Sequence, residues 1–484
     1  MARPAAQAPH RPLCGLEPNP QARLPRCYGA ERHRPHHATQ PAAGRPHRQN
    51  QRPRDLYEGH RLLLLLRARR RPRAQQKGGQ HMKRVKLKDI TISITDGKHG
   101  DCKGQDNSGY YFISCKDVFD GNIHYENARQ ITEEDFIDAD KRTKLAPNDI
   151  LVTNSGTIGR MALVKDAPKT KRTTFQKSVA IVKPDSTRVF PQYLYYLLKS
   201  KVGDFINSSN GAAQKNLLLS TMRDFEMEIE ENLDVQTSIA EVLSRYDALI
   251  ENYQRQIKLL EEAAQRLYKE WFVDLRFPGH QSTPIINTLP QSWQKKTAKD
   301  FFTMSIGKTP PRAESGWFST DDKDVPWVSI SDMKDVMFVN TTNERLTHEA
   351  CDHFNVKIVP EGTILLSFKL TVGRVSIADK PVCTNEAIAH FMRDGDNWRE
   401  YTLMYLRNYH YDSLGNTSGI SKAVNSTIIK NMPFVMPSND ILDGFSKLAG
   451  PIFNKIRNLS IQIRNLSEAR DRLLPKLMNA EIEV

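Results

Sequence analysis

Two short patterns in this sequence look like parts of phosphate-binding or catalytic sites, and each lacks a component that the chemistry requires. Gly307-Lys308-Thr309 resembles the end of a phosphate-binding loop, but the first glycine of that motif would fall at Phe302. Asp332-Met333-Lys334 has the spacing of half a nuclease site. At Asp117, its counterpart in the internal repeat described below, Phe119 takes the place of the lysine. No G-x-G-x-x-G pattern opens a helix. The sequence predicts a chain with no catalytic residue and no cofactor of its own.

The cysteines have no spacing typical of a metal site. No C-x-x-C pair and no Cys/His group with zinc-ligand spacing occurs. The only long apolar run, residues 62–66, is far too short to span a bilayer. We therefore expect a cytoplasmic protein without a bound metal. The cysteines are Cys14, Cys27, Cys102, Cys115, Cys351 and Cys383.

Both halves of the chain carry clusters of Gly, Ser, Thr, Lys and Arg between apolar runs. Such side chains hydrogen-bond phosphates and base edges, so the clusters are candidate DNA contacts, although any single lysine is more often a solvated surface charge. Arg160 and Arg374 stand out because each follows a glycine at an equivalent place. A repeated Gly-Arg could equally be a structural turn with a salt bridge. The candidates are Lys98, His99, Ser155, Thr157, Arg160, Lys171, Arg172, Lys177 and Lys215 in the first half, and Lys308, Arg312, Lys369, Arg374 and Lys422 in the second.

The net charge of +14 is unevenly distributed along the chain. Residues 1–81 hold 16 Arg and 1 Lys against four acidic residues, a net charge of +13, so the remaining residues are nearly neutral at +1. Bulk charge therefore gives no support for DNA binding by the rest of the chain. Contacts with phosphate have to come from local clusters.

Residues 1–81 are not expected to belong to the fold. They contain no Ser, Val, Ile, Phe or Trp and are crowded with Arg, Pro, Ala, His and Gln, a composition that builds no core. One interpretation is a disordered basic arm that binds nucleic acid. We favour the interpretation that residues 1–81 are a translation of DNA that lies upstream of the true start codon. Lys77-Gly78-Gly79 is what a purine-rich ribosome-binding sequence would encode when it is read in this frame. Met82 would then be the start of the protein.

Two long helices are predicted by apolar residues that recur with alternating steps of four and three. The pattern begins at residue 239 and reappears 206 residues later in the same frame. At about 1.5 Å per residue the first seam is about 50 Å long, longer than a globular domain needs. The first seam is Ile239, Leu243, Tyr246, Ile250, Tyr253, Ile257, Leu260, Ala264, Leu267 and Trp271. The second is Phe445, Ala449, Ile452, Ile456, Leu459, Ile463, Leu466, Arg470, Leu473 and Leu477, in which only Arg470 is polar.

The sequences before the two helices also correspond, which indicates an internal duplication. Similar short segments recur at offsets of 214 or 215 residues, and others at offsets of 206 to 208 residues, close to the 206-residue offset of the helices. The pairs are 113–117 with 328–332, 149–152 with 363–366, 157–160 with 371–374, Gly211 and Lys215 with Gly419 and Lys422, and 220–221 with 426–427.

Short runs rich in β-branched and apolar residues predict buried strands at 150–153, 178–182, 362–367 and 387–392. The predicted fold class is α+β, with two mixed α/β heads, each followed by a long helix, in a pseudo-twofold internal repeat. Pro278 and Gly279 mark the end of the first helical region. Because the chain runs head, helix, head, helix, the helices pair most simply as an antiparallel coiled coil.

Residues 82–484 resemble the specificity subunit of type I restriction-modification enzymes. The most specific match is QRLYKEWFVDLRFPG at 265–279, together with 211–219 leading into 236–239. The family often has Glu-Gln before this helix, whereas here Val235 precedes Gln236. The resemblance implies a target recognition domain at 82–233, which we call the first head, and another at 277–438, the second head. Conserved spacer helices would follow at 234–276 and 439–484.

The resemblance also implies partners. Each head would read one half of a split, asymmetric site in double-stranded DNA. Two methyltransferase subunits would dock along the helices, and motor-nuclease subunits would join for cleavage. S-adenosylmethionine, ATP and Mg²⁺ would belong to those partners. A helix pair of fixed length would then set the spacing between the half-sites.

Two other functions stay open from the residues alone. A methyltransferase or nuclease in its own right is disfavoured because its motifs are missing, and it would show activity without partners. A two-headed adaptor that binds proteins through its heads is excluded only weakly, and it would select no DNA consensus from random duplexes.

Overall fold

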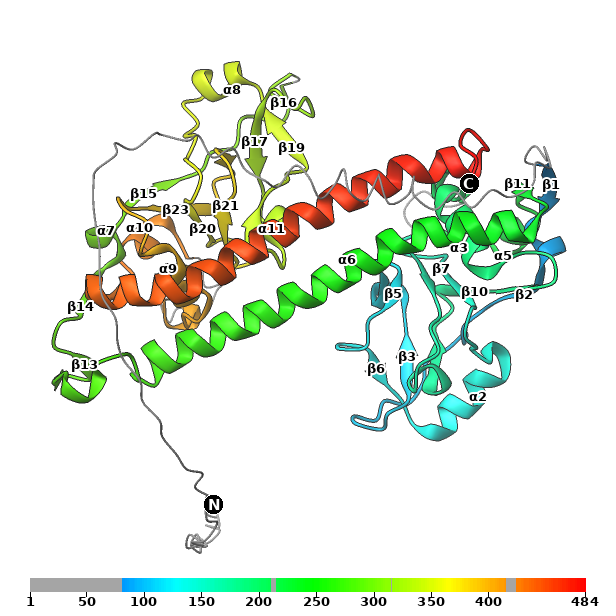
Figure 1. Ribbon diagram of the computed structural model, residues 1–484, viewed down its shortest axis with the longest axis horizontal. Coiled ribbons are helices and arrows are strands. Elements are labelled where there is room, and N and C mark those ends of the chain that lie inside the picture. The colour runs from blue at the N-terminus through cyan, green and yellow to red at the C-terminus, as the bar shows by residue number, and fades with distance from the viewer. Residues whose placement is uncertain (1–80, 210–214, 315, 415–423) are drawn as a thin grey trace, which may run out of the picture. The chain divides into compact units, whose positions relative to one another are not determined.

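The structure is a computed structural model that describes residues 81–209, 215–314, 316–414 and 424–484 (Figure 1). The expected N-terminal extension, except for His81, and the correspondence of Gly211 with Gly419 lie outside these residues. In the described part of the chain, no helix is both long and apolar enough to cross a membrane.

The main sheet of the first head is built around two strands that are buried on both faces. β7 (Ile150–Thr153) and β10 (Val179–Pro184) pair antiparallel, and their aliphatic, largely β-branched side chains suit a two-sided core. β2 (Thr91–Asp96) and β8 (Met161–Leu163) complete the order β2-β10-β7-β8. The strands predicted at 150–153 and 178–182 are confirmed.

Smaller elements surround this sheet. β3 (Tyr111–Ile113) pairs parallel with β9 (Thr173–Phe175) and antiparallel with β6 (Arg129–Gln130). Near the chain ends of the head, β1 (Met82–Lys86) pairs with β11 (Glu226–Glu230). The remaining elements are β4 (Val118–Phe119), β5 (Asn122–Ile123), α2 (Glu133–Thr143), α3 (Pro191–Ser200), α4 (Val202–Asn207) and α5 (Leu219–Arg223).

The second head repeats this plan. Its five-stranded main sheet has the order β15-β23-β20-β21-β18, in which β15 (Thr303–Ile306), β23 (Ile388–Met392), β20 (Ile364–Ser367) and β21 (Val375–Ala378) take the places of β2, β10, β7 and β8. The predicted strands at 362–367 and 387–392 are confirmed. The additional strand is β18 (Phe338–Val339), which pairs parallel with β21.

The parallel strand pair of the first head also has a counterpart. β17 (Val325–Val328) pairs parallel with β22 (Cys383–Thr384), as β3 does with β9, and β14 (Gln294–Thr297) pairs with β24 (Pro433–Met436), as β1 does with β11. Shared topology of this kind supports the duplication inferred from the sequence. The other elements are β12 (Ile285–Ile286), β13 (Leu289–Pro290), α7 (Ala298–Phe301), β16 (Phe318–Ser319), β19 (Glu344–Leu346), α8 (His348–His353), α9 (Arg399–Arg407) and α10 (Ser426–Lys430).

The two long helices lie side by side and run in opposite directions (Figure 1). They are α6 (Leu233–Tyr268) and α11 (Asn439–Met478). Arg470, near the end of α11, pairs with Asp247 near the start of α6, while Phe445, near the start of α11, packs on Trp271 just beyond α6, with ring centroids 5.8 Å apart. The α-helical hydrogen-bond pattern of α6 changes to a π-helical turn at Lys269–Val273.

Each head contains the end of the helix that belongs to the other half. In the core of the first head, Leu474, Leu477 and Met478 of α11 pack with the start of α6. In the core of the second head, Tyr268 and Trp271 at the end of α6 pack with the start of α11. The two halves therefore hold each other's helices in place.

The predicted seam residues are buried or half-buried, and several of them belong to the head cores. Ile239, Leu243, Ile250, Ile456 and Leu459 are buried. The half-buried members are Tyr246, Tyr253, Ile257, Leu260, Leu267, Ile452, Ile463, Leu466 and Leu473.

Arg470 interrupts the apolar seam because it has an acidic partner on α6. Its Nη1 donates to Asp247 Oδ1 at 2.5 Å, and Tyr196 Oη on α3 donates to Asp247 Oδ2 at 2.6 Å. Burial alone would lower the pKa of Arg470, but the hydrogen bond and charge of Asp247 raise it above its ordinary value. One carboxylate thus joins both helices to the first head.

Candidate nucleic-acid interface

Three loops meet at the same end of the main sheet in each head, and we call them the rim of that head. The first loop follows the edge strand, the second joins the hairpin of the main sheet, and the third leads into the central strand. The rim of the first head is 97–99, 154–160 and 176–178, and the rim of the second head is 307–309, 368–374 and 385–387.

The same backbone hydrogen bonds hold both rims together. One joins the first loop to the central strand, and another joins the second loop to the third. The donor–acceptor pairs are Gly97–Val179 (3.2 Å) and Asn154–Ser178 (3.1 Å) in the first head, and Gly307–Ile388 (3.1 Å) and Phe368–Ala387 (2.9 Å) in the second. The rims are therefore equivalent frames on which each head carries its own side chains.

Glycine begins the first loop of both rims because the chain crosses a neighbouring backbone there. A Cβ atom on Gly97 would lie 2.1 Å from Phe175 O, and one on Gly307 would lie 2.1 Å from Thr384 Oγ1. Neither position accommodates a side chain. This explains the glycine of Gly307-Lys308-Thr309, which packs two strands and is no part of a phosphate-binding loop.

The repeated Gly-Arg motif closes the second loop as a structural turn. In the second head Ser367 Oγ donates to Thr371 O (2.5 Å) and accepts from Arg374 N (3.0 Å). Thr153 makes the equivalent pair of bonds in the first head, to Thr157 O and from Arg160 N. The two arginine side chains differ, since Arg374 Nη1 donates to the carbonyl of Ile330 (2.8 Å) whereas Arg160 is exposed.

The rim of the first head brings several predicted residues together. Lys98, whose backbone N donates to Phe175 O, lies beside Lys177, whose backbone N donates to Lys98 O. The Lys98 ammonium is engaged by Asp138 (3.2 Å) and Asp135 (3.6 Å), and the hydrogen bond with Asp138 raises the pKa of Lys98 and lowers that of Asp138. Lys177 is exposed and therefore more accessible to a phosphate than Lys98.

The other polar residues of this rim lie at different depths. His99 Nε2 lies 2.8 Å from Asp96 Oδ2, a carboxylate that also pairs with Arg142 (2.6 Å). Ser155 is half-buried, whereas Thr157 is exposed in the middle of the second loop. Lys215 is exposed beside Asn216, which bridges to Ser155.

Two predicted residues of the first head lie away from the rim. Lys171 and Arg172 are exposed at the start of β9, whereas the rim follows its end. Arg172 lies over the ring of Tyr110, with its guanidinium carbon 5.6 Å from the ring centroid. These two cations belong to a separate surface next to β3.

Arg160 faces a cleft between the first head and the helices. The cleft has a volume of about 1280 Å³ and is also lined by Lys199, Asp247, Arg470 and, from the second head, Lys334. Arg160 thus lines a surface that the first head shares with the helix pair.

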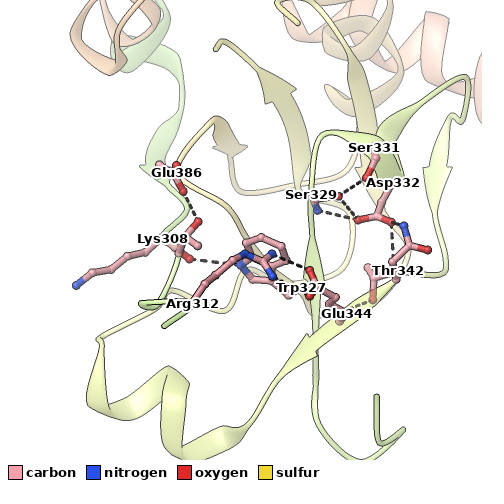
Figure 2. Close-up of polar contacts among 11 residues, drawn as sticks. Lys308, Arg312, Trp327, Ser329, Ser331, Asp332, Thr342, Glu344 and Glu386 are labelled. Atoms are coloured by element: carbon pink, nitrogen blue, oxygen red, sulfur yellow. Dashed lines mark hydrogen bonds and ion pairs between the residues drawn. The ribbon is translucent and has the colours of Figure 1, made fainter. Parts of the chain in front are cut away.

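In the rim of the second head, Lys369 lies near an acidic residue, Glu386. Thr309 Oγ1 donates to the Glu386 carboxylate, which lowers the pKa of Glu386. Figure 2 shows Lys308 extending away from Glu386, and its ammonium donates to Phe354 O at 2.6 Å. Lys369 is exposed, and its charge also lowers the pKa of Glu386.

Arg312 has a role in holding the second head together. It makes a bidentate ion pair with Glu344 (2.9 and 2.8 Å), which raises the pKa of Arg312 and lowers that of Glu344 (Figure 2). Its guanidinium carbon also lies 4.3 Å from the ring centroid of Phe318 and 5.2 Å from that of Trp327. Lys422, the last predicted residue of this head, lies outside the described residues.

Asp332, which has the spacing of half a nuclease site, is occupied by local hydrogen bonds. Its Oδ2 accepts from Ser329 N (2.8 Å) and Ser329 Oγ (2.6 Å), and its Oδ1 accepts from Asn343 Nδ2 (2.8 Å) (Figure 2). Asp117 accepts from Ser114 in the same way in the first head. The repeated Ser-x-x-Asp pattern is therefore a local cap.

Two residues that stand out in the rim of the second head, Glu386 and Leu370, are not among the candidates predicted from the sequence. Glu386 was not expected because an acid does not fit a search for phosphate contacts. Leu370 was not expected because it is apolar, yet it is 99% exposed at the tip of the second loop. Its equivalence to Gly156 at the 214-residue offset is the signal that would have found it.

The fold defines a duplicated protein in which paired helices carry two α/β heads with equivalent polar rims. Residues 79–262 and 290–460 match the sequence model of the family described as type I restriction modification DNA specificity domain. The chain belongs to this family.

Known proteins agree with this assignment. The MjaIX specificity subunit, from a type I restriction enzyme of Methanocaldococcus jannaschii, is 28% identical over 389 residues, which cover 77% of this chain and 87% of the relative. The HindI specificity subunit of Haemophilus influenzae is 23% identical over 370 residues, covering 62% and 80%. The solved S subunit of a type I restriction-modification system from M. genitalium has a TM-score of 0.52 at 14% identity, covering 84% of this chain and 98% of its own, and shares the fold.

Proposed function

We propose that this chain is the DNA-recognition subunit of a type I restriction-modification complex and has no catalytic role of its own. The observation that carries the proposal is the repeated rim, in which equivalent loops are held by equivalent hydrogen bonds. The side chains at the tips differ, with Gly156 in one head where Leu370 stands in the other. An asymmetric DNA site of two parts requires two heads that bind the DNA backbone in the same way but carry different side chains toward the bases.

Each head, at 82–233 and 277–438, reads one half of that site. Lys177 and Lys369 are exposed and would contact phosphates, and the exposed hydroxyl of Thr157 would contact a base edge or a phosphate. The remaining sequence-predicted residues are weaker choices where the structure gives them an intramolecular partner, as it does for Lys98 and Arg312.

The helices at 234–276 and 439–484 act as an antiparallel coiled coil that fixes the distance between the half-sites. Their outer faces carry exposed apolar side chains, including Leu259 (59% exposed) and Leu448 (52% exposed), which suit the docking of two methyltransferase subunits. Motor-nuclease subunits join for cleavage. S-adenosylmethionine, ATP and Mg²⁺ are held by those partners, and the complex works in the cytoplasm, where its DNA lies.

The test is selection of DNA by the assembled chain. The full chain is co-purified with its methyltransferase subunits and mixed with random duplexes, and the bound fraction is sequenced. A consensus of two short blocks separated by a spacer of constant length is expected. Binding without any enriched sequence, or a single continuous block, would contradict the proposal and favour the adaptor.

A further inference from the structure

Leu370 has an unfavourable backbone conformation and an exposed side chain, and neither is stabilised by contacts within the second head. It lies at the tip of the second rim loop with φ of 60° and is 99% exposed. Thr371 N donates to Lys369 O at 2.7 Å, which closes a three-residue turn around Leu370. Such γ-turns with positive φ are rare and strained, and a leucine in the left-handed region is uncommon.

The first head makes the same turn with the residue that suits it. Gly156 has φ of 80°, and Thr157 N donates to Ser155 O at 3.1 Å. Glycine adopts this backbone without steric cost. Leu370 therefore stands where the shared frame favours glycine, and its side chain gains almost no burial in return.

The loop beneath Leu370 is firmly held. Phe368 is buried and its N donates to Ala387 O, while the Ser367 hydroxyl bonds to both ends of the turn that ends at Arg374. A leucine on such a base is presented in a fixed position. A strained backbone conformation that the surrounding contacts hold in place is typical of binding sites.

The surroundings of Leu370 point to DNA as its partner. The adjacent Lys369 is exposed, whereas the ammonium of Lys308 in the neighbouring rim loop already donates to Phe354 O. A cation beside an apolar tip matches a duplex, in which phosphates flank the base edges. Among base edges in the major groove, only thymine offers an apolar group, its 5-methyl.

We propose that Leu370 makes an apolar contact with a thymine methyl group in the half-site read by the second head. Lys369 then binds the adjacent phosphate. The glycine at 156 lets the backbone of the first head approach its own half-site closely, so the two heads differ in what they read at one equivalent position. This inference rests on the proposed function.

The experiment compares thymine with deoxyuridine, which lacks only the methyl group. The full chain, assembled with its methyltransferase subunits, is titrated with duplexes of the selected consensus in which each thymine is replaced singly. For the unaltered chain, one replacement in the second-head half-site should weaken binding about 4-fold, the effect of one buried methyl group. Leu370→Gly should bind the thymine duplex at least about 4-fold more weakly and should show no further loss with uracil at that position.

Two controls separate this contact from a folding effect. Leu370→Gly relieves the left-handed strain, so its thermal midpoint should equal or exceed that of the unaltered chain. Ile358→Ala, which alters another exposed apolar residue of the same head, should leave the uracil effect intact. Lys369→Ala should instead weaken all duplexes alike and reduce the salt dependence of binding.

The inference is overturned if the second-head half-site contains no thymine, or if Leu370→Gly retains the same loss at every uracil position. A half-site in which Leu370→Gly changes DNA bending and no uracil has an effect would indicate a minor-groove wedge and would likewise overturn it. Failure of the proposed function is distinguishable, because then the unaltered chain selects no two-part consensus at all.

Discussion

Replacing Arg470 by methionine tests how the helix pair is fixed to the first head. Methionine keeps most of the length and apolar stem of arginine but removes the charge that Asp247 pairs with. The carboxylate would then keep its hydrogen bond from Tyr196, at 2.6 Å. We expect the end of α11 to open more readily as a result.

The size of the effect follows from the exposure of the pair. The side chains of Arg470 and Asp247 are 15% and 26% exposed, with Nη1 and Oδ1 2.5 Å apart. Breaking a fully buried pair costs about 3–5 kcal/mol, and an exposed pair contributes about 0–1 kcal/mol. We therefore expect a loss of about 2 kcal/mol, which corresponds to roughly 30-fold in the opening equilibrium.

The assay is hydrogen exchange of the backbone amides at 463–478, read by mass spectrometry on the full chain. Arg470→Met should speed exchange about 30-fold. Asp247→Asn should cost less, because Arg470 still bonds Asp471 (2.8 Å). Arg472→Met, which alters an arginine 83% exposed, is the control and should change exchange by less than about 3-fold.

The double variant completes the test. If the ion pair fixes the helix end, Arg470→Met with Asp247→Asn should be less destabilising than the sum of the single changes by about 1 kcal/mol or more. Unchanged exchange in Arg470→Met, or strictly additive losses in the double variant, would refute this reasoning.

Three further predictions concern the second head and its rim. Burial lowers the pKa of His390 to about 4. As the pH falls, the histidine is therefore protonated in the unfolded chain before it is protonated in the folded chain. The contribution of His390 to the free energy of unfolding is fully present above about pH 6.5 and falls by about 3 kcal/mol as the pH drops toward 4. His390→Ile, which copies Ile181 of the first head, should flatten the pH dependence of the thermal midpoint, and an unchanged slope would contradict this. Arg312→Lys should lower the free energy of unfolding by about 1 kcal/mol in urea titrations, because lysine cannot replace the bidentate bond to the partly exposed Glu344, and an unaltered midpoint would argue against it. Lys369→Ala should reduce the slope of log affinity against log salt by about 1 without changing the selected consensus, and a changed consensus would show that Lys369 reads a base.

The framework of the fold was predictable from the sequence because it is written twice. The echo of 157–160 in 371–374 marks the turn closed by Thr153 and Ser367, and the echo of 113–117 in 328–332 marks a Ser-x-x-Asp cap. Repeated local motifs of this kind encode backbone geometry. They identify the frame and say little about which side chains face DNA.

What the sequence could not reveal depends on contacts between distant segments. In the sequence Arg470 breaks the apolar seam, and only the fold brings Asp247, 223 positions earlier, opposite it. Likewise, Lys98 and Arg312 look like free cations in the sequence, and only the fold brings Asp138 and Glu344 to them. The exposure of Leu370 is also visible only in the fold. From the sequence, an apolar residue close to two strands is ordinarily predicted to be buried in the core.

Exchange of one head tests the central claim most directly. Residues 82–233 are replaced by the corresponding head of another member of the family, and the chimaera is assembled with methyltransferase subunits for selection from random duplexes. We predict that one block of the consensus changes while the other block and the spacer length stay the same. A change in both blocks, or in neither, would contradict the account of two heads that read DNA independently from a fixed pair of helices.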